Sequence, residues 1–381
     1  MKILAVLIFF LTFYRVTFLF PYAYFALLFA FLGFSTFIWP SQRKKFFESI
    51  GFLPFLILFF IIFYSLVIDV ITGSLFSNFT NTFVVRGISL VVISAFPAYF
   101  LVSYALKWDY KSALDIIAVA FGIQFLFWAL TFFDPNFKYI INDFMGGSNN
   151  AVNLRGHNLE VRGFGISSEM NYTSPFMTVI TCLLLVRRKA LSIVSIFTQL
   201  INSNLVVVAV IFGLIFSRIG VFYKVSLGFL AFSCAYLIGD LFLPRLIAEF
   251  KSGESRTVNA LVDNHLVIIN DGYFGHLLGE FLYTFQGASQ ITSDIGWIHL
   301  YNYGGALFVL LFILFLLSLS ISAFGYKFFS LVWFGVGLVL NTKGLLFSPN
   351  SFYFVTFVFA FLNYGERSQA SKLNKVKQGE F

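Results

Sequence analysis

Residues Phe52–Val67 read FLPFLILFFIIFYSLV, without a single charged side chain. Two further blocks of the same kind follow, Gly87–Leu106 and Leu307–Ala323. Their apolar residues are continuous and show neither the two-residue period of a strand nor the 3.6-residue period of an amphipathic helix. A bilayer span needs about 20 apolar residues, and only helices or closed barrels satisfy their own backbone in hydrocarbon. Because these blocks do not alternate as barrel strands do, they predict an all-α polytopic membrane protein.

The composition of the chain supports the same class. Hydrophobic residues make up 59% of the 381 positions and charged residues 11%, whereas a soluble domain is about half apolar and about a quarter charged. The net charge of +8 does not indicate nucleic-acid binding, because the basic residues form short clusters between apolar blocks. Cys182 and Cys234 fall inside predicted spans, so we expect neither a disulfide nor a metal site from them. The 56 phenylalanines we attribute to membrane composition.

Lysine and arginine clusters mark the cytoplasmic side of short loops. The clusters at 43–45, 107–111, 187–189 and 372–377 all fall inside if about 12 helices span the membrane and both termini are cytoplasmic. These spans form a single transmembrane domain, 1–364, followed by a cytoplasmic tail, 365–381. The predicted spans are roughly 3–14, 20–39, 50–70, 87–106, 112–132, 168–186, 190–202, 205–217, 221–243, 295–318, 327–340 and 350–364.

Two boundaries of this topology leave an alternative. Reading 191–216 as one helix removes a crossing and puts segment 245–293 in the cytoplasm. We prefer two short helices that turn at the polar triplet Asn202-Ser203-Asn204. The first 20 residues resemble a signal peptide, but they lack a small-residue cleavage site, so we interpret them as the first span.

Two long polar segments, about 133–167 and 245–293, are predicted to be extracytoplasmic loops. The first ends on a dense charged stretch, and the second begins and ends with charged residues. An arginine near a membrane surface is more often a headgroup anchor than a functional group, as we expect for Arg15 and Lys343; for Arg86 the two interpretations are evenly balanced. His157 and His276 we interpret as solvated, and capping or snorkelling explains Asp69, Asp115 and Asp240. Joint placement, where the loops re-enter the membrane, singles out Arg162, Glu169, Arg256 and Asp294.

This pattern resembles the Wzy-type O-antigen and capsule repeat-unit polymerases, which are distantly related to the O-antigen ligases. The segment Arg162–Tyr172 (RGFGISSEMNY) is similar to the Arg-Gly-Glu/Asn stretch that closes the third outer loop of that family. Ser252–Arg256 (SGESR) resembles the run that opens the fifth loop, and Ser293–Trp297 (SDIGW), followed by Gly304-Gly305, resembles the way into the next span. The chain departs from the family at 202–204, where relatives often carry Ser-Arg. Asp294 stands where ligases carry a histidine, which favours a polymerase.

The resemblance implies a glycosyltransferase of the GT-C-like type at the periplasmic face of a bacterial inner membrane. It would transfer a growing glycan from undecaprenyl diphosphate to a lipid-linked repeat unit. Arginine forks suit a diphosphate leaving group, and a hydroxyl acceptor needs a base. No metal-ligand spacing occurs, so we expect a metal-independent reaction without a cofactor. The candidate catalytic residues are Arg162, Glu169, Arg256, Asp294 and, as the reserve base, His265; the candidate substrate-binding residues are Arg86, Arg155, Asn171 and Arg245.

The expected partners are undecaprenyl-diphosphate-linked oligosaccharide and membrane lipids, with a polysaccharide chain-length regulator as a further candidate and no nucleic acid. Two alternatives remain open: a flippase for lipid-linked glycans and an O-antigen ligase. Transporters often show internal repeats, broken helices and ionisable groups near the bilayer midplane. The sequence shows no evident repeat, and its charges cluster outside the predicted spans, so we favour the enzyme.

Overall fold

The computed structural model describes residues 2–16, 22–73, 82–144, 165–166, 179–184, 189–202, 220–242, 266–269, 272–280, 295–342 and 344–378. Within these ranges the regular secondary structure is entirely helical. Four helices are long and apolar enough to cross a membrane, and a fifth crossing results if one bent pair counts as a single span. The all-α class is thus confirmed for the described residues, and these helices support a membrane protein. The count of about 12 spans stays a prediction.

The four long helices coincide with four predicted spans. They are α4 (Phe52–Ile71), the continuous helix 83–105, α8 (Tyr110–Phe133) and α18 (Gly296–Phe324). The second of these changes its winding along its length, through α6 (Phe83–Leu90), the π-helical η3 (Val91–Ala95), α7 (Phe96–Phe100) and the π-helical η4 (Leu101–Ala105).

The segment predicted as a short loop after the second span is helical instead. α2 (Tyr22–Ser35) and η1 (Thr36–Ile38) are followed by α3 (Pro40–Ile50), and the helices on either side of the break at Trp39 are bent by 117°. Trp39 is extended and Pro40 occupies the first turn of α3, where a missing N–H and a fixed φ favour helix initiation. The chain therefore turns sideways here before α4 begins.

The other described helices include several that are too short to span a bilayer alone. They are α1 (Lys2–Phe13), α9 (Pro135–Phe144), α12 (Lys189–Asn202), α14 (Val221–Phe242), α17 (Gly272–Leu278), α19 (Phe328–Leu340) and α20 (Ser351–Gln378).

α20 runs past the predicted span end at 364, because Gly365 is followed by good helix formers such as Glu, Gln, Ala, Lys and Leu. At least the first part of the predicted tail is thus helical.

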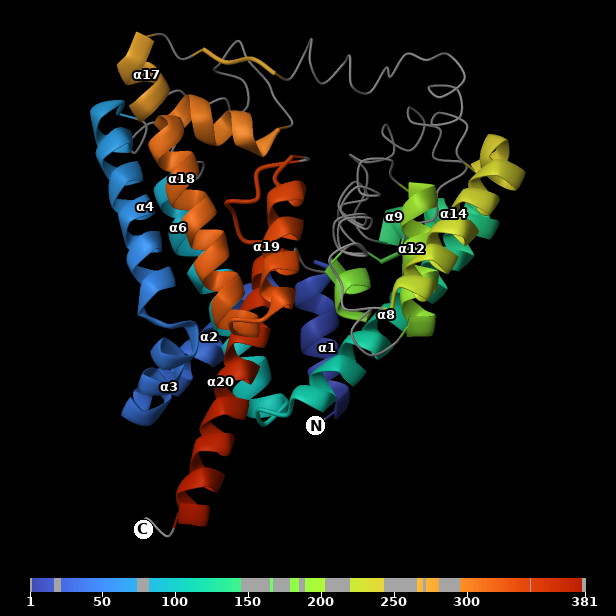
Figure 1. Ribbon diagram of the computed structural model, residues 1–381, viewed down its shortest axis with the longest axis horizontal. Coiled ribbons are helices and arrows are strands. Elements are labelled where there is room, and N and C mark those ends of the chain that lie inside the picture. Colours follow the sequence, from blue (N-terminus) through green and yellow to red (C-terminus); the bar gives the residue numbers. More distant parts are fainter. Residues whose placement is uncertain are drawn as a thin grey trace.

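α18 is the helix around which one side of the molecule packs. It contacts α4, α17, α19 and α20, while α1 packs on α8 and α12 on α14. In Figure 1, α17 lies at one end of this body, above α4 and α18, whereas α3 and the last turns of α20 lie at the opposite end. We refer to these as the α17 end and the α3 end.

Aromatic side chains fill the interior and also cover the outside. Phe308, Phe312 and Trp333 are fully buried, whereas Phe59 and Phe63 on α4 are about half exposed. The abundant phenylalanine thus serves packing and an apolar exterior, as expected for membrane composition. Cys182 is buried and free, and the side chain of Cys234 lies outside the described residues.

Candidate functional site

Of the nine predicted site residues, only Arg86 belongs to the described part of the chain. The flanks of two predicted motifs are described as well: Gly165 and Ile166 in the first loop, and Ile295–Trp297 at the start of α18. The predicted meeting of the two loops is therefore neither confirmed nor contradicted. The eight residues outside the described ranges are Arg155, Arg162, Glu169, Asn171, Arg245, Arg256, His265 and Asp294.

Arg86 is half-buried on α6. Thr82 begins this helix, and its hydroxyl accepts a hydrogen bond from the backbone amide of Val85 at 3.3 Å, which is a typical N-cap. One turn before Arg86, the ring of Phe83 lies 4.3 Å from that of Tyr303 on α18. Phe83 thus packs α6 against α18 one turn before Arg86.

α18 is broken at Gly304 and Gly305. Gly304 has φ −129° and ψ 16°, and Gly305 has φ 63° and ψ −163°, a conformation that glycine alone adopts readily. A Cβ on Gly305 would lie 2.5 Å from the backbone nitrogen of Gly279. The end of α17 and Gly279, both from the second polar loop, thus pack backbone to backbone against the break.

A buried carboxylate lies beside this break. Asp69, in the last turn of α4, is fully buried, and Oδ1 accepts a hydrogen bond from the hydroxyl of Tyr303 at 2.9 Å. The same hydroxyl lies 3.1 Å from the carbonyl oxygen of Ser65. Burying a carboxylate is unfavourable unless it is hydrogen-bonded, and ionisable residues inside apolar helices are often functional. Capping or snorkelling, which the sequence suggests for Asp69, does not agree with this burial.

Asn302, next to Tyr303, ties another part of the second loop to α18. Its side-chain Nδ2 donates to the carbonyl of Val267 at 2.9 Å, and its Oδ1 accepts from the amide of Ile269 at 3.2 Å. Its backbone carbonyl accepts from the amide of Glu280 at 3.1 Å. We call Asp69, Asn302 and Tyr303 the break cluster. It holds two described segments of the second loop, 266–269 and 272–280, against the helix body.

The first loop is attached elsewhere, to α8. Gln124 is fully buried, and its Oε1 accepts a hydrogen bond from the backbone amide of Ile166 at 3.1 Å. Gly165 lies so close to this side chain that a Cβ there would overlap the Gln124 amide and come within 2.8 Å of Cγ. A glycine of the RGFGISSE motif is thus required by packing. Its backbone reaches the interior of the helix body.

Other polar residues have structural surroundings. Nδ1 of His276 on α17 lies 2.8 Å from the hydroxyl of Tyr301, so this histidine has a protein partner as well as solvent. The guanidinium of Arg15 donates to the carbonyl of Pro349 and thus links two chain segments instead of acting only as a headgroup anchor. Among the described residues, no group of three or more His, Cys, Asp and Glu side chains is placed to hold a metal ion.

The break cluster offers a carboxylate, a phenol and a carboxamide, and Gln124 on α8 offers a second carboxamide. Such groups bind hydroxyls and anions, and a carboxylate can accept a proton. Sequence reasoning missed Asp69 and Gln124, although each is a polar residue within an otherwise apolar span, which is itself a signal. Comparison with protein-family models, with curated proteins and with solved structures finds no match to this chain.

Proposed function

We propose that the chain is a membrane glycosyltransferase that polymerises lipid-diphosphate-linked repeat units of a surface polysaccharide. The observation that carries this proposal is the attachment of both long polar loops to buried polar groups of the helix body. The second loop lies on the break cluster, and the first lies on Gln124. A substrate with a lipid tail in the bilayer and a charged head at its surface needs a site of this kind, where apolar helices and polar loops meet.

The reaction assigned to this site is the replacement of a diphosphate by a hydroxyl. The acceptor hydroxyl oxygen forms a bond to the anomeric carbon of the donor glycan, and the bond from that carbon to the undecaprenyl diphosphate oxygen breaks. Arg162 and Arg256, assisted by Arg86 or Arg155, stabilise the negative charge that develops on the leaving diphosphate. Glu169 or Asp294 accepts the hydroxyl proton, with His265 as the reserve. Asn171 and Arg245 bind the glycan or its diphosphate.

The topology that accompanies this function is about 12 spans with both termini in the cytoplasm of a bacterium. The α17 end then faces the periplasm. In support, α1 begins and α20 ends at the α3 end, away from α17 (Figure 1). The basic cluster at 43–45 lies within α3, and the cluster at 107–111 lies at the start of α8, beside α3 through the contact of Lys45 with Trp108. Both clusters are thus at the α3 end, which agrees with a cytoplasmic location.

The test is transfer in detergent with purified protein and its lipid-diphosphate-linked repeat unit, read as a ladder of glycan lengths. We expect a ladder without added nucleotide, and none from Arg162→Glu or Arg256→Glu protein that elutes and melts like wild type. Arg43→Glu, an exposed arginine at the α3 end, is the matched control and should leave the ladder unchanged. A normal ladder from well-folded Arg162→Glu protein contradicts the role of that residue. Failure of intact protein with its native repeat unit contradicts the polymerase.

A flippase is the second candidate, and the break in α18 favours it specifically. Transporters place substrate at discontinuous helices, where non-helical backbone lines the binding site. Glycans of cells lacking the protein separate the two functions. Loss of a polymerase leaves single repeat units at the surface, whereas loss of a flippase leaves no outer glycan. A ligase differs from both in needing a different acceptor in the ladder assay.

A further inference from the structure

The α3 end carries a helix whose features the proposed reaction does not use. α3 follows α2 after a bend of 117° and packs on α20 and α4. Its buried residues are Phe46, Ser49 and Ile50, which are spaced as on one helix face. If α2 crosses the membrane as the second predicted span, a helix bent from it by 117° lies close to the plane of the membrane.

The exposed residues on α3 and just before it combine cations with aromatic rings. Arg43 and Lys44 are exposed, and the side chain of Lys44 is 75% accessible. Trp39, just before the helix, is 66% exposed, and Phe47 is 53% exposed. Aromatic rings and basic side chains at one surface are typical of helices that lie in the headgroup region, with the rings in the acyl boundary and the cations at the phosphates.

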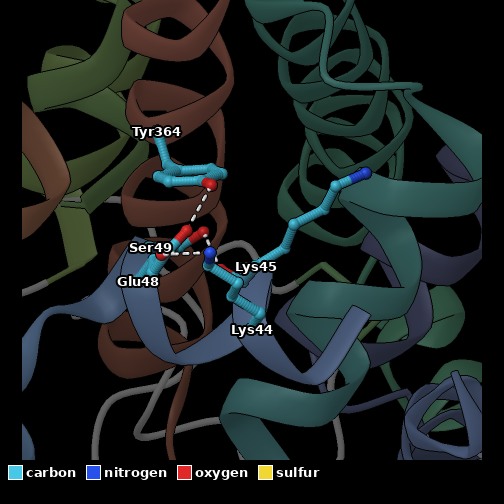
Figure 2. Close-up of polar contacts among 5 residues, drawn as sticks. All are labelled: Lys44, Lys45, Glu48, Ser49 and Tyr364. Carbon is cyan, nitrogen blue, oxygen red and sulfur yellow. Dashed lines mark hydrogen bonds and ion pairs between the residues drawn. The ribbon is translucent and has the colours of Figure 1, made fainter. Parts of the chain in front are cut away.

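Contacts with the rest of the body fix the orientation of α3. Figure 2 shows Glu48 between Lys44 and Tyr364: the Tyr364 hydroxyl donates to Glu48 Oε2 at 2.7 Å, and Lys44 Nζ lies 3.8 Å from Oε1. Lys45 Nζ lies 5.9 Å from the centre of the Trp108 ring, a cation–π distance. Arg43, in contrast, makes no ion pair with any of the described residues. α3 is thus anchored to α20 through Glu48, while Arg43 stays available to an external anion.

We propose that α3 is an in-plane interfacial helix that binds anionic phospholipid headgroups, with Arg43 and Lys44 as the selecting cations. Charge complementarity and the exposed aromatic residues identify a lipid surface as the occupant, because a soluble acidic partner has no need of Trp39 and Phe47. The basic residues that follow Tyr364 in α20, beginning with exposed Arg367, add positive potential at the same end. A basic residue near an anionic leaflet contributes measurably to lipid attraction.

Native mass spectrometry of the purified full chain tests this. The protein is incubated with equal amounts of phosphatidylglycerol and phosphatidylcholine of the same acyl composition, and retained lipids are counted. We expect preferential retention of phosphatidylglycerol. In the Arg43→Gln/Lys44→Gln variant we expect this preference to fall by roughly tenfold. Lys45 is left unchanged because its ammonium packs on Trp108.

The matched control is Lys375→Gln/Lys377→Gln, which removes the same two charges from the end of α20. We expect it to keep most of the preference. Equal losses in both pairs indicate attraction by net charge alone and overturn the assignment to α3, as does an undiminished preference in the Arg43/Lys44 pair. If the Arg43→Gln/Lys44→Gln variant does not fold, Lys44→Gln alone replaces it, because the Lys44 side chain is more exposed than Glu48, its partner in the described ion pair. An unchanged preference for phosphatidylglycerol in Lys44→Gln overturns the proposal.

Discussion

Replacing Gly165 by alanine tests whether the first polar loop is anchored in the helix body. A Cβ on Gly165 would lie 2.8 Å from Cγ of Gln124 and closer still to its Cδ and Nε2. Gln124 is fully buried, and its Oε1 holds the amide of Ile166 at 3.1 Å. The added methyl group must therefore displace either the side chain or the loop, and either movement breaks this hydrogen bond.

Two terms set the size of the effect. Leaving a buried amide group without its hydrogen bond costs about 1–3 kcal/mol, and overpacking a filled interior costs about 1–3 kcal/mol. We expect the docking of 165–166 on α8 to weaken by about 2–6 kcal/mol in total, which shifts the docked-to-undocked equilibrium by roughly 30-fold to 25,000-fold. If Arg162 and Glu169 act from this loop, transfer activity falls together with docking.

Hydrogen–deuterium exchange of the peptide that contains Gly165 measures docking, and the glycan ladder measures activity. Gly122→Ala is the matched control, because Gly122 lies on the same helix as Gln124 and an added Cβ there meets nothing within 4 Å. This control should leave both readouts unchanged and raise helix stability slightly.

A double variant makes the argument sharper. Gln124→Ala/Gly165→Ala removes the very atoms that the new methyl group overlaps. We therefore expect the double variant to exchange no faster than Gln124→Ala alone, so that the two substitutions are strongly non-additive. Additive effects, or normal exchange in Gly165→Ala itself, would refute the anchoring of this loop by Gln124.

Three further predictions concern the break in α18 and the turn before α8. Gly305→Ala should lower the free energy of unfolding in detergent by about 3 kcal/mol or more, because the added Cβ overlaps the backbone of Gly279 and alanine also disfavours a positive φ. Gly325→Ala has the same positive φ but meets nothing closer than 3.7 Å, so it should cost only about 1–2 kcal/mol. Equal effects of the two substitutions contradict the packing of α17 on the break. Tyr303→Phe removes the hydroxyl that donates to Asp69 and should lower the free energy of unfolding by about 1–3 kcal/mol. Tyr326→Phe, at a residue that is 95% exposed, should have no effect. An unchanged stability of Tyr303→Phe rules out a contribution of this hydrogen bond. Asp109 caps α8, and hydrogen bonds from the Ser112 hydroxyl and nearby backbone amides lower the pKa of its carboxyl. The stabilisation by the carboxylate is therefore present at neutral pH and is lost as the pH falls through that lowered pKa. Asp109→Ala should cost about 1 kcal/mol at pH 7 and progressively less as the carboxyl is protonated, while a cost that does not change with pH contradicts capping by the carboxylate.

Much of the fold was predictable because bilayer-length apolar blocks constrain the chain strongly. The spans predicted at 50–70, 87–106, 112–132 and 295–318 coincide with described helices. α3 is not predicted, because the three consecutive basic residues at 43–45 indicate a cytoplasmic loop. The signal for a helix was nevertheless present: a proline after an extended Trp39 and apolar residues spaced three and four apart. Short helices such as α1, α12 and α19 have fewer than the roughly 20 residues that a bilayer span needs. The sequence therefore does not decide how deeply they lie in the membrane.

Most of the predicted site residues are charged residues at the ends of the two polar loops, where the sequence predicts exposure. Asp69 and Gln124 escaped this criterion because their partners are distant in the chain: Tyr303 is 234 positions from Asp69, and Ile166 is 42 positions from Gln124. A different criterion finds both. A polar group inside an apolar span is unfavourable without a partner, so each implies a segment that reaches into the helix body to satisfy it. In this chain Ile166 belongs to the first polar loop, whereas Tyr303 lies in α18 beside the break against which the second loop packs. Both buried groups thus link the interior of the helix body to the proposed chemistry at its surface.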